Sequence, residues 1–215
     1  MKKIILIIVI ATFFANYSNA QGHRTDYRDN LQFGLKLGFN NSNVYNTSGD
    51  SFDANSKFGF ATGVFLAVPI TKYIGFQPEI LYSQKGFTAT GRMLGTDYDL
   101  TRTTSYIDVP LLLSIKPTGL LTLLVGPQYS YLVHQKDVFA NANMSYQEEQ
   151  NFKNDNIRKN ILCFIGGADF NLEHMVISVR AGWDVQNNHG DGTSTTPSYK
   201  NVWYQATLGF RIFND

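Results

Sequence analysis

Apolar and polar residues alternate over long stretches of this chain. Between Tyr106 and Lys116, every odd-numbered residue is aliphatic and every polar residue falls at an even-numbered position. Such alternation indicates a β-strand with two different faces, because successive side chains of a strand point to opposite sides. Eight runs show the pattern and are the predicted strands: 31–40, 58–69, 73–86, 104–116, 120–135, 160–172, 174–186 and 200–213.

The connections between these runs alternate in length. Three are tight and lie at 70–72, 117–119 and Glu173. The other four are rich in Asn, Ser, Asp, Thr and Gly, and they cover residues 41–57, 87–103, 136–159 and 187–199. Short turns on one side and long loops on the other are typical of an up-and-down barrel in a bacterial outer membrane. Each run also reaches the roughly 9–11 residues that a tilted strand needs to cross a bilayer.

The two faces of these strands decide between two kinds of barrel. A secreted lipocalin-like barrel is also eight-stranded, but it is apolar inside and polar outside. Here one face is almost continuously apolar, and the other holds Gly, Ser, Thr and Gln with a few isolated charges. Small polar residues suit the lumen of an eight-stranded barrel, which is only wide enough for side chains. We therefore predict an all-β fold, an eight-stranded antiparallel up-and-down transmembrane β-barrel with three short periplasmic turns and four long extracellular loops.

The N-terminal residues have the composition of an export signal. Lys2 and Lys3 precede an apolar run at 4–14, and a short polar segment then ends at Ala20. This order of basic, apolar and small-residue regions is typical of a secretory signal peptide. We expect residues 1–20 to be the signal peptide, 21–30 a periplasmic N-terminal segment, and 31–215 a barrel domain located in the cell outer membrane.

Charge and cysteine content exclude some classes of partner and site. Removing Lys2 and Lys3 with the signal peptide leaves 16 of the 18 Lys and Arg residues against 17 Asp and Glu, a formal net charge of −1. That balance argues against nucleic acid as a partner, because binding phosphates requires a concentrated positive field. Cys163 is the one cysteine of the chain, and it is expected to be a small apolar residue inside a strand.

Charged residues on the polar face are the candidate site residues. An ion or proton pathway would use them, but a lumen network of paired charges is favoured, because a desolvated charge must find a partner in so narrow a barrel. We expect Arg180 and Arg211 both to have carboxylate partners inside. The predicted structural network comprises Lys36, Glu79, Asp108, Lys116, Asp169, Arg180, Asp184 and Arg211.

Catalytic chemistry has little support in the sequence. A rim hydrolase would draw on His134, which the alternation places on the same face as Ser130, or on His189 in the last loop. Neither has a diagnostic spacing, so we predict a protein that is not an enzyme and has no catalytic residue, metal or cofactor. Besides outer-membrane lipid, the expected partner is a protein that contacts the long loops 136–159 and 87–103, because long loops on a rigid scaffold commonly carry function.

Several stretches resemble a known family. The fourth predicted strand reads Tyr-Ile-Asp-Val-Pro-Leu-Leu-Leu at 106–113, the first reads Phe-Gly-Leu-Lys-Leu-Gly at 33–38, and the fifth contains Gly-Pro-Gln-Tyr at 126–129. Together with the stretch 75–86, they resemble the PorT-like outer-membrane β-barrel families of Bacteroidetes, which are of the OmpX/OmpA-like eight-stranded type. The resemblance implies the same fold and a structural or surface-interaction role in the cell envelope. The alternative that it implies is an accessory component of a gliding-associated, type IX-like protein-export complex.

Overall fold

The computed structural model describes residues 27–48, 53–93, 96–141, 145–150, 157–189 and 198–212. The expected signal peptide, residues 1–20, lies outside the described residues. Of the expected N-terminal segment 21–30, residues 27–30 are described, and they include a short 3-10 helix, η1 (Tyr27–Asp29). The described part of the chain has no helix that is long and apolar enough to cross a membrane.

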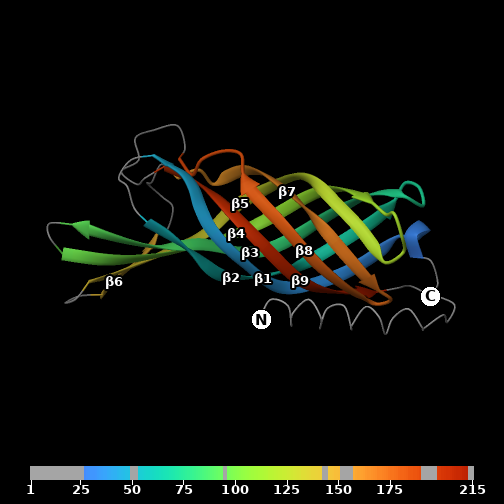
Figure 1. Cartoon of the computed structure of the whole chain (residues 1–215), viewed down its shortest axis with the longest axis horizontal. Helices are drawn as coiled ribbons and strands as arrows, with labels where there is room; N and C mark the ends of the chain where they lie inside the picture. The colour runs from blue at the N-terminus through green and yellow to red at the C-terminus, as the bar shows by residue number, and fades with distance from the viewer. Residues whose placement is uncertain are drawn as a thin grey trace, which may run out of the picture.

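Antiparallel β-strands account for most of the described chain (Figure 1). Eight of them pair in a closed ring in the order β1-β2-β3-β4-β5-β7-β8-β9, and β9 pairs back to β1. The ninth described strand, β6, pairs with β5 and lies outside the ring. The strands are β1 (Gln32–Ser48), β2 (Asp53–Pro69), β3 (Ile74–Met93), β4 (Thr96–Ile115), β5 (Leu121–Asn141), β6 (Ser145–Gln150), β7 (Asn160–Leu172), β8 (Met175–Asp184) and β9 (Ser198–Ile212). The predicted fold class is thereby confirmed.

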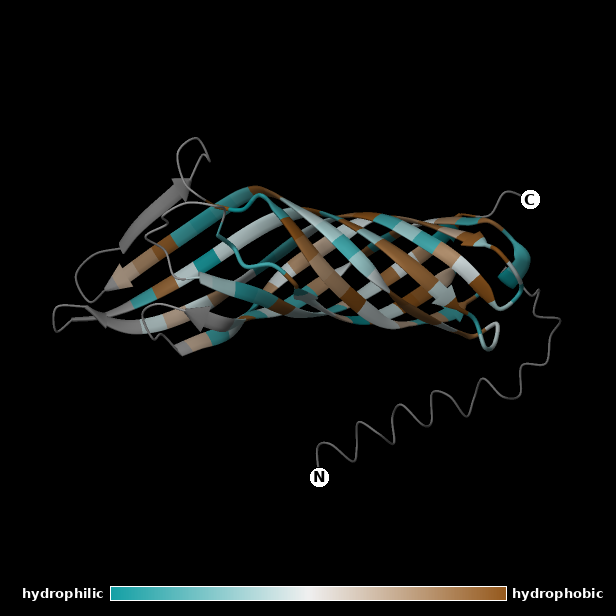
Figure 2. Cartoon of the chain, turned by 90° about the horizontal axis from the view of Figure 1, so that it is seen from above, coloured by the Kyte–Doolittle hydropathy of each residue, from teal (hydrophilic) through white to brown (hydrophobic). Residues whose placement is uncertain are grey.

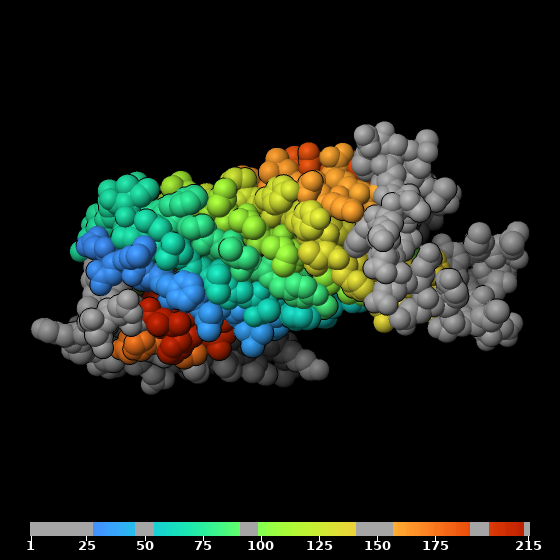
Figure 3. Space-filling view, turned by 180° about the vertical axis from the view of Figure 1, so that it is seen from behind, coloured from blue at the N-terminus to red at the C-terminus, as the bar shows by residue number. Residues whose placement is uncertain are grey.

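The two faces of the barrel wall differ as the alternation predicts. Along β1, Leu35 and Leu37 are 50% and 65% exposed, whereas Lys36 between them is 2% exposed. The same contrast runs around the ring and shows as alternating colours along the strands in Figure 2. In Figure 3 the strands from β1 to β5 lie side by side and form a continuous wall. Large apolar side chains therefore cover the outside of the barrel, and polar side chains fill the inside.

Strand length is where the sequence-based prediction is wrong. β3 and β4 contain 20 residues each and stay paired as far as Met93 and Thr96, so the expected loop 87–103 is mostly a β-hairpin. The expected loop 136–159 contains the end of β5 and all of β6. Beyond the lipid, a strand has no need of an apolar outer face, so the alternation that marks it is lost. The tight connections after β2, β4 and β7 lie where the sequence placed them.

A charge on the outer face should destabilise the barrel strongly. Leu208 is 50% exposed and lies halfway along the apolar stripe of β9, next to Leu37 and Ile177 on the neighbouring strands. We expect Leu208→Arg to lower the free energy of unfolding in lipid vesicles by about 2–4 kcal/mol, the range for a basic residue at the bilayer midplane. Urea unfolding followed by tryptophan fluorescence measures it. Thr101→Arg, on the part of β4 beyond the apolar stripe, is the control and should change little; equal losses would contradict a lipid-embedded face.

Candidate functional site: the filled lumen

A cluster of four charged residues, the central cluster, lies in the middle of the barrel. Lys36, Glu79, Asp169 and Arg180 come from β1, β3, β7 and β8, and each is at most 4% exposed. Arg180 binds Glu79 through two bonds, with Nη1 2.6 Å from Oε2 and Nη2 2.8 Å from Oε1. Lys36 Nζ lies 2.8 Å from Glu79 Oε1 and 3.6 Å from Asp169 Oδ2. Two cations and two anions thus cancel in charge and join four strands across the lumen.

Neighbouring groups add further contacts to this cluster. The Gln77 side chain donates to Glu79 Oε1 at 2.8 Å and to Asp169 Oδ2 at 3.2 Å. Arg180 Nη2 lies 3.4 Å from Asp169 Oδ1, and the Lys36 ammonium sits 4.8 Å from the centre of the Phe65 ring. A buried charge is costly to desolvate unless its partners compensate it. Here each charged group has more than one partner, so the cluster holds the strands in one arrangement.

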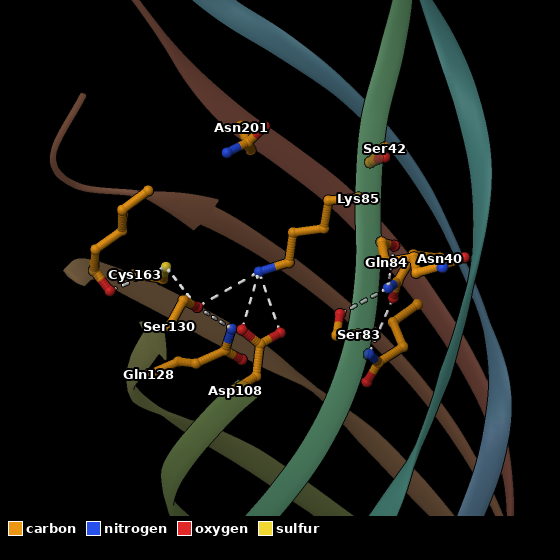
Figure 4. A network of polar contacts seen from close by, with 12 residues as sticks. Asn40, Ser42, Ser83, Gln84, Lys85, Asp108, Gln128, Ser130, Cys163 and Asn201 are labelled. Carbon is orange, nitrogen blue, oxygen red and sulfur yellow. Dashed lines mark hydrogen bonds and ion pairs between the residues drawn. The ribbon is translucent and has the colours of Figure 1, made fainter. Parts of the chain in front are cut away.

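A second group, the upper cluster, lies nearer the long-strand end, and Figure 4 shows its residues Lys85, Asp108, Ser130 and Cys163. Lys85 Nζ lies 3.1 Å from Asp108 Oδ2 and 3.5 Å from Ser130 Oγ, and it also sits 3.7 Å from the centre of the Trp203 ring. Ser130 in turn lies 3.3 Å from Cys163 Sγ. All five side chains are nearly inaccessible. One carboxylate, one hydroxyl and the aromatic rings of Trp203 and Tyr106 therefore compensate the charge of the lysine.

Asp184 connects this cluster to the closing strands. Its Oδ1 accepts from Cys163 Sγ at 3.1 Å, and its Oδ2 accepts from the backbone N–H of Asn201 at 2.9 Å. Its backbone carbonyl accepts from the Tyr45 hydroxyl at 2.6 Å. These contacts join β1, β7, β8 and β9. Cys163 is buried and free, as a small core residue would be, and its thiol takes part in the polar network.

A third group closes the mouth of the barrel at the long-strand end. Arg102 binds Asp137 in a bidentate pair, with Nε 2.8 Å from Oδ1 and Nη2 2.7 Å from Oδ2. Its guanidinium lies beside the edge-to-face ring pair of Phe87 and Tyr199, 5.9 and 5.8 Å from the two ring centres, and Nη1 donates to the Tyr199 hydroxyl at 3.3 Å. Burial opposes the charged form, but Tyr199 and Asp137 hold the pKa of Arg102 above its ordinary value. This mouth cluster seals the lumen with strands β3, β4, β5 and β9.

Side chains of β1 form hydrogen bonds with the backbone of β3 where the pairing of β2 with β3 is interrupted. The register of β2 against β3 shifts between Ser56 and Ala61, so the regular ladder is broken there. Asn40 Nδ2 donates to the Gln84 carbonyl at 2.9 Å (Figure 4). Ser42 Oγ accepts from the N–H of Gly86 at 2.8 Å and donates to its carbonyl at 2.9 Å.

Two glycines leave room for these hydrogen bonds. A Cβ at Gly59 would lie 2.4 Å from the same Gln84 carbonyl oxygen that Asn40 reaches. Gly86 itself has φ +154°, a conformation that favours glycine, and a Cβ there would lie 2.1 Å from the Arg102 carbonyl oxygen. Inward side chains of β1 thus supply hydrogen bonds that the β2–β3 backbone pairing omits.

The short-turn end of the barrel relies on backbone carbonyls. Lys116 Nζ donates to the carbonyl of Arg28 at 2.9 Å, which ties η1 to the end of β4. Arg211 Nη1 donates to the carbonyl of Glu173 at 3.2 Å, and Nη2 donates to the Asn171 side chain. Among the described residues, no carboxylate lies within ion-pair distance of Arg211. The expectation of a carboxylate partner for Arg211 is therefore wrong, because the β7–β8 turn offers carbonyl oxygens instead.

A protein-family model described as "Outer membrane protein beta-barrel domain" matches residues 19–200. The chain belongs to this family. It is accordingly an outer-membrane protein, and its apolar outer face lies in lipid. In such barrels the short turns face the periplasm, so the long strands of this family member extend on the extracellular side.

Solved structures of outer-membrane proteins are similar to this barrel. Ail, the attachment invasion locus protein of Yersinia pestis, has 14% identity and a TM-score of 0.47, over 84% of this chain and 98% of that chain. Neisserial surface protein A has 9% identity and a TM-score of 0.46, over 84% and 97%. The outer membrane protease OmpT from Escherichia coli has 10% identity and a TM-score of 0.41, over 88% and 99%. No curated protein matches the chain.

The predicted site residues of this outer-membrane barrel fall into separate groups. Four of them meet in the central cluster, and Asp108 and Asp184 belong to the upper cluster. Lys116 and Arg211 lie apart from both, at the periplasmic end. Three charged residues were missed: Lys85, Arg102 and Asp137. Lys85 has the same strand parity as Glu79 and could have been found by extending the alternation, whereas the other two lie in stretches predicted as loop.

The prediction that His134 and Ser130 share one face of the strand is wrong. A register shift between β4 and β5 occurs opposite Ser105 and Tyr106. Beyond it the buried positions of β5 are Gln135 and Asp137, and His134 is only half-buried. Ser130 instead accepts from Gln128 and contacts Cys163 inside the lumen. Among the described residues, no group of three or more His, Cys, Asp or Glu side chains is arranged to hold a metal ion.

Removing one member of the central cluster should cost more than removing a neutral pair. Glu79→Leu leaves Lys36 and Arg180 short of an anion, so we expect a loss of about 3–5 kcal/mol in the free energy of unfolding. The double variant Glu79→Leu with Arg180→Leu leaves the Lys36–Asp169 pair neutral, and it should lose much less than the sum of the single changes. Urea unfolding in lipid vesicles measures all three. Strictly additive losses would contradict a coupled cluster.

Proposed function

We propose that this outer-membrane protein is a closed, non-catalytic barrel that anchors a β-sheet at the cell surface for contact with a partner protein. The observation that carries the proposal is a contrast between two parts of one structure. The lumen is filled by paired side chains at three levels, while β3, β4 and β5 continue well beyond the part of the barrel that carries the apolar outer face.

The filled lumen argues against transport. The central, upper and mouth clusters each join strands that are not neighbours in the ring, through Arg180–Glu79, Lys85–Trp203 and Arg102–Tyr199. Their members are at most 7% exposed. An eight-stranded barrel has no interior space beyond its own side chains. Charges locked in pairs favour a rigid plug over a water-filled path, so we assign the predicted charge network a structural role.

The long strands favour surface contact. A membrane crossing takes about 9–11 residues, but β3 and β4 contain 20 residues and β5 contains 21. The excess of roughly ten residues corresponds to roughly 30 Å of extended strand. We call the extracellular parts of β3, β4 and β5 together with β6 the surface sheet. It replaces the expected loops 87–103 and 136–159 as the surface for a protein partner.

Identifying the proteins that co-purify with this barrel tests the proposed function. The protein is extracted in mild detergent from its native outer membranes, and its size and co-purifying proteins are measured by native gel and mass spectrometry. The matched variant replaces 91–98 by an Asn-Gly turn between the register partners Thr90 and Asp99, which shortens the hairpin and leaves the barrel intact. We expect reproducible companions with the natural chain and their loss with the variant.

Two outcomes of that experiment would contradict the proposal. One is a particle that contains a single chain and detergent when the protein is extracted at its native abundance. The barrel would then be an anchor without a stable protein partner. The other is companions that stay bound to the shortened variant. If the retained companions were large secretion components, the PorT-like resemblance would favour the role in a protein-export complex.

A closed lumen also predicts that the protein conducts almost no ions across a planar bilayer. In planar bilayers we expect the natural protein to show no large, stable open state, because the paired side chains leave no continuous water path. Replacing Lys36, Glu79, Asp169 and Arg180 together by serine removes the central plug and should increase the frequency of small conductance steps. Porin-sized openings of the natural protein would contradict the closed-barrel proposal.

A further inference from the structure

Arg211 is a buried cation without a counter-charge of its own. It is 7% exposed, and the described part of the chain places no carboxylate within ion-pair distance of it. Its Nη1 and Nη2 donate to the Glu173 carbonyl and the Asn171 side chain, and its Nε has no hydrogen-bond partner among the described groups. Arginine stays protonated in proteins, and a buried charge is costly unless it is compensated. Arg211 therefore points to an anion from outside the chain.

The central cluster does not supply that negative charge. Asp169 is a carboxylate whose field reaches Arg211, but it lies beyond ion-pair distance and is held by Lys36 and Arg180. Glu79 binds the same two cations, so the two anions and two cations of the cluster balance one another. One positive charge, that of Arg211, is left over at the short-turn end.

Polar side chains extend from Arg211 along the inner wall. Arg211 donates to the side chain of Asn171, and Asn171 Nδ2 in turn donates to Thr122 Oγ1 at 3.0 Å. Continuing the register of β4 and β5 by one residue places Lys116 opposite Thr122. We call these four residues the short-turn site. They join β9, β7, β5 and the end of β4 at one level of the barrel.

The unused hydrogen-bonding capacity of this site favours an acceptor. Arg211 Nε is an unused donor, and the Thr122 hydroxyl accepts from Asn171 while its own proton remains to be donated. Lys116 brings a second cation to the same end. Arg211, Thr122 and Lys116 are 5–7% exposed, against 2–4% for the central cluster, so this is the level that solvent reaches from the short turns.

We propose that the short-turn site binds a single carboxylate group that enters from the periplasm. One carboxylate brings one negative charge, which is the charge that Arg211 lacks, whereas inorganic phosphate carries more than one near neutral pH. The two carboxylate oxygens also match two donors, the arginine and the Thr122 hydroxyl. The carboxylate belongs either to a free acid or to the C-terminus of a peptide. This inference does not depend on the surface sheet, which lies at the other end.

NMR of the folded barrel in nonionic maltoside micelles tests the inference. Sodium acetate is added to the isotope-labelled protein, with sodium chloride at equal ionic strength as the reference, and the arginine Nε–H resonances are followed. We expect the Arg211 resonance to shift saturably with acetate and to stay in place with chloride. Arg180 is the internal control, because its Nε also has no described partner but Glu79 already balances its guanidinium. Its resonance should not move.

Variants give the second arm, read out as the urea midpoint. Acetate should raise the midpoint of the natural protein, because a ligand that binds only the folded state stabilises it. Arg211→Gln removes the charge-assisted hydrogen bond and should lower the acetate affinity by roughly tenfold or more. Lys72→Gln removes a positive charge from the exposed turn after β2 and is the matched control, which should respond like the natural protein.

A further variant covers the case in which Arg211→Gln does not fold, as heat-dependent gel mobility would show. Thr122→Val keeps the arginine and removes only the hydroxyl. It should weaken the acetate response, while Lys72→Gln again leaves the response unchanged.

Alanyl-alanine and its C-terminal amide identify the source of the carboxylate. If the ligand is a peptide terminus, the dipeptide shifts the Arg211 resonance at lower concentrations than acetate does, and the amide has no effect. If the ligand is a free acid, acetate acts at the lower concentration. Either result supports a carboxylate site.

Several results would overturn the inference. They are the absence of a saturable Arg211 shift, an equal shift of the Arg180 resonance, inorganic phosphate acting at lower concentration than acetate, or an acetate response that survives Arg211→Gln. A response that appears only after Asp215→Asn would show that a carboxylate of the chain itself fills the site, which also excludes an external ligand. The proposed surface-contact function would be unaffected by any of these results.

Discussion

A lipid bilayer offers no hydrogen bonds to a polypeptide backbone, and this constraint governs the whole structure. Every N–H and C=O group in the membrane must be satisfied within the protein, so a sheet that crosses it must close on itself. With eight strands the ring is narrow, and the inward side chains must fill it. Those side chains include charges, so each needs compensation nearby. Closure of a narrow ring buries the inward charges, so they must be paired. Lys36, Glu79, Asp169 and Arg180 form such a neutral set.

Outside the membrane, backbone groups can form hydrogen bonds with water, so the sheet can stay open there. Water can satisfy a free strand edge, so the wall no longer has to close. β5 exchanges β7 for β6, and the hairpin of β3 and β4 continues as an open sheet (Figure 1). The mouth cluster around Arg102 lies at this boundary and keeps the lumen sealed where the ring begins to open. One molecule thus combines a closed, filled barrel with an open sheet that extends from it.

The constraint also explains what the sequence could predict. Where lipid requires an apolar outer face, alternation identified every ring strand, the tight turns and the orientation of Lys36 and Glu79. Arg102 and Asp137 were missed because their strands leave the lipid and lose the apolar stripe that marks them. His134 was misplaced because a register shift changes the parity of β5, and a shift of this kind depends on the facing strand. Arg211 was paired wrongly because backbone carbonyls of a turn carry no residue signature.

The hydrogen bond from Gln205 to Asn40 joins the last strand of the ring, β9, to the first, β1, at the seam where the ring closes. Asn40 in turn donates to the Ser83 hydroxyl and to the Gln84 carbonyl on β3. Gln205 and Asn40 are separated by 165 residues along the chain, so their contact forms only when the whole ring is assembled. High sequence separation slows folding, because long loops must be closed before their contacts stabilise anything. A partly assembled wall would expose both the seam and the unpaired lumen charges to lipid. Barrel formation should therefore be a single cooperative event, in which closing the seam and packing the interior cannot be separated.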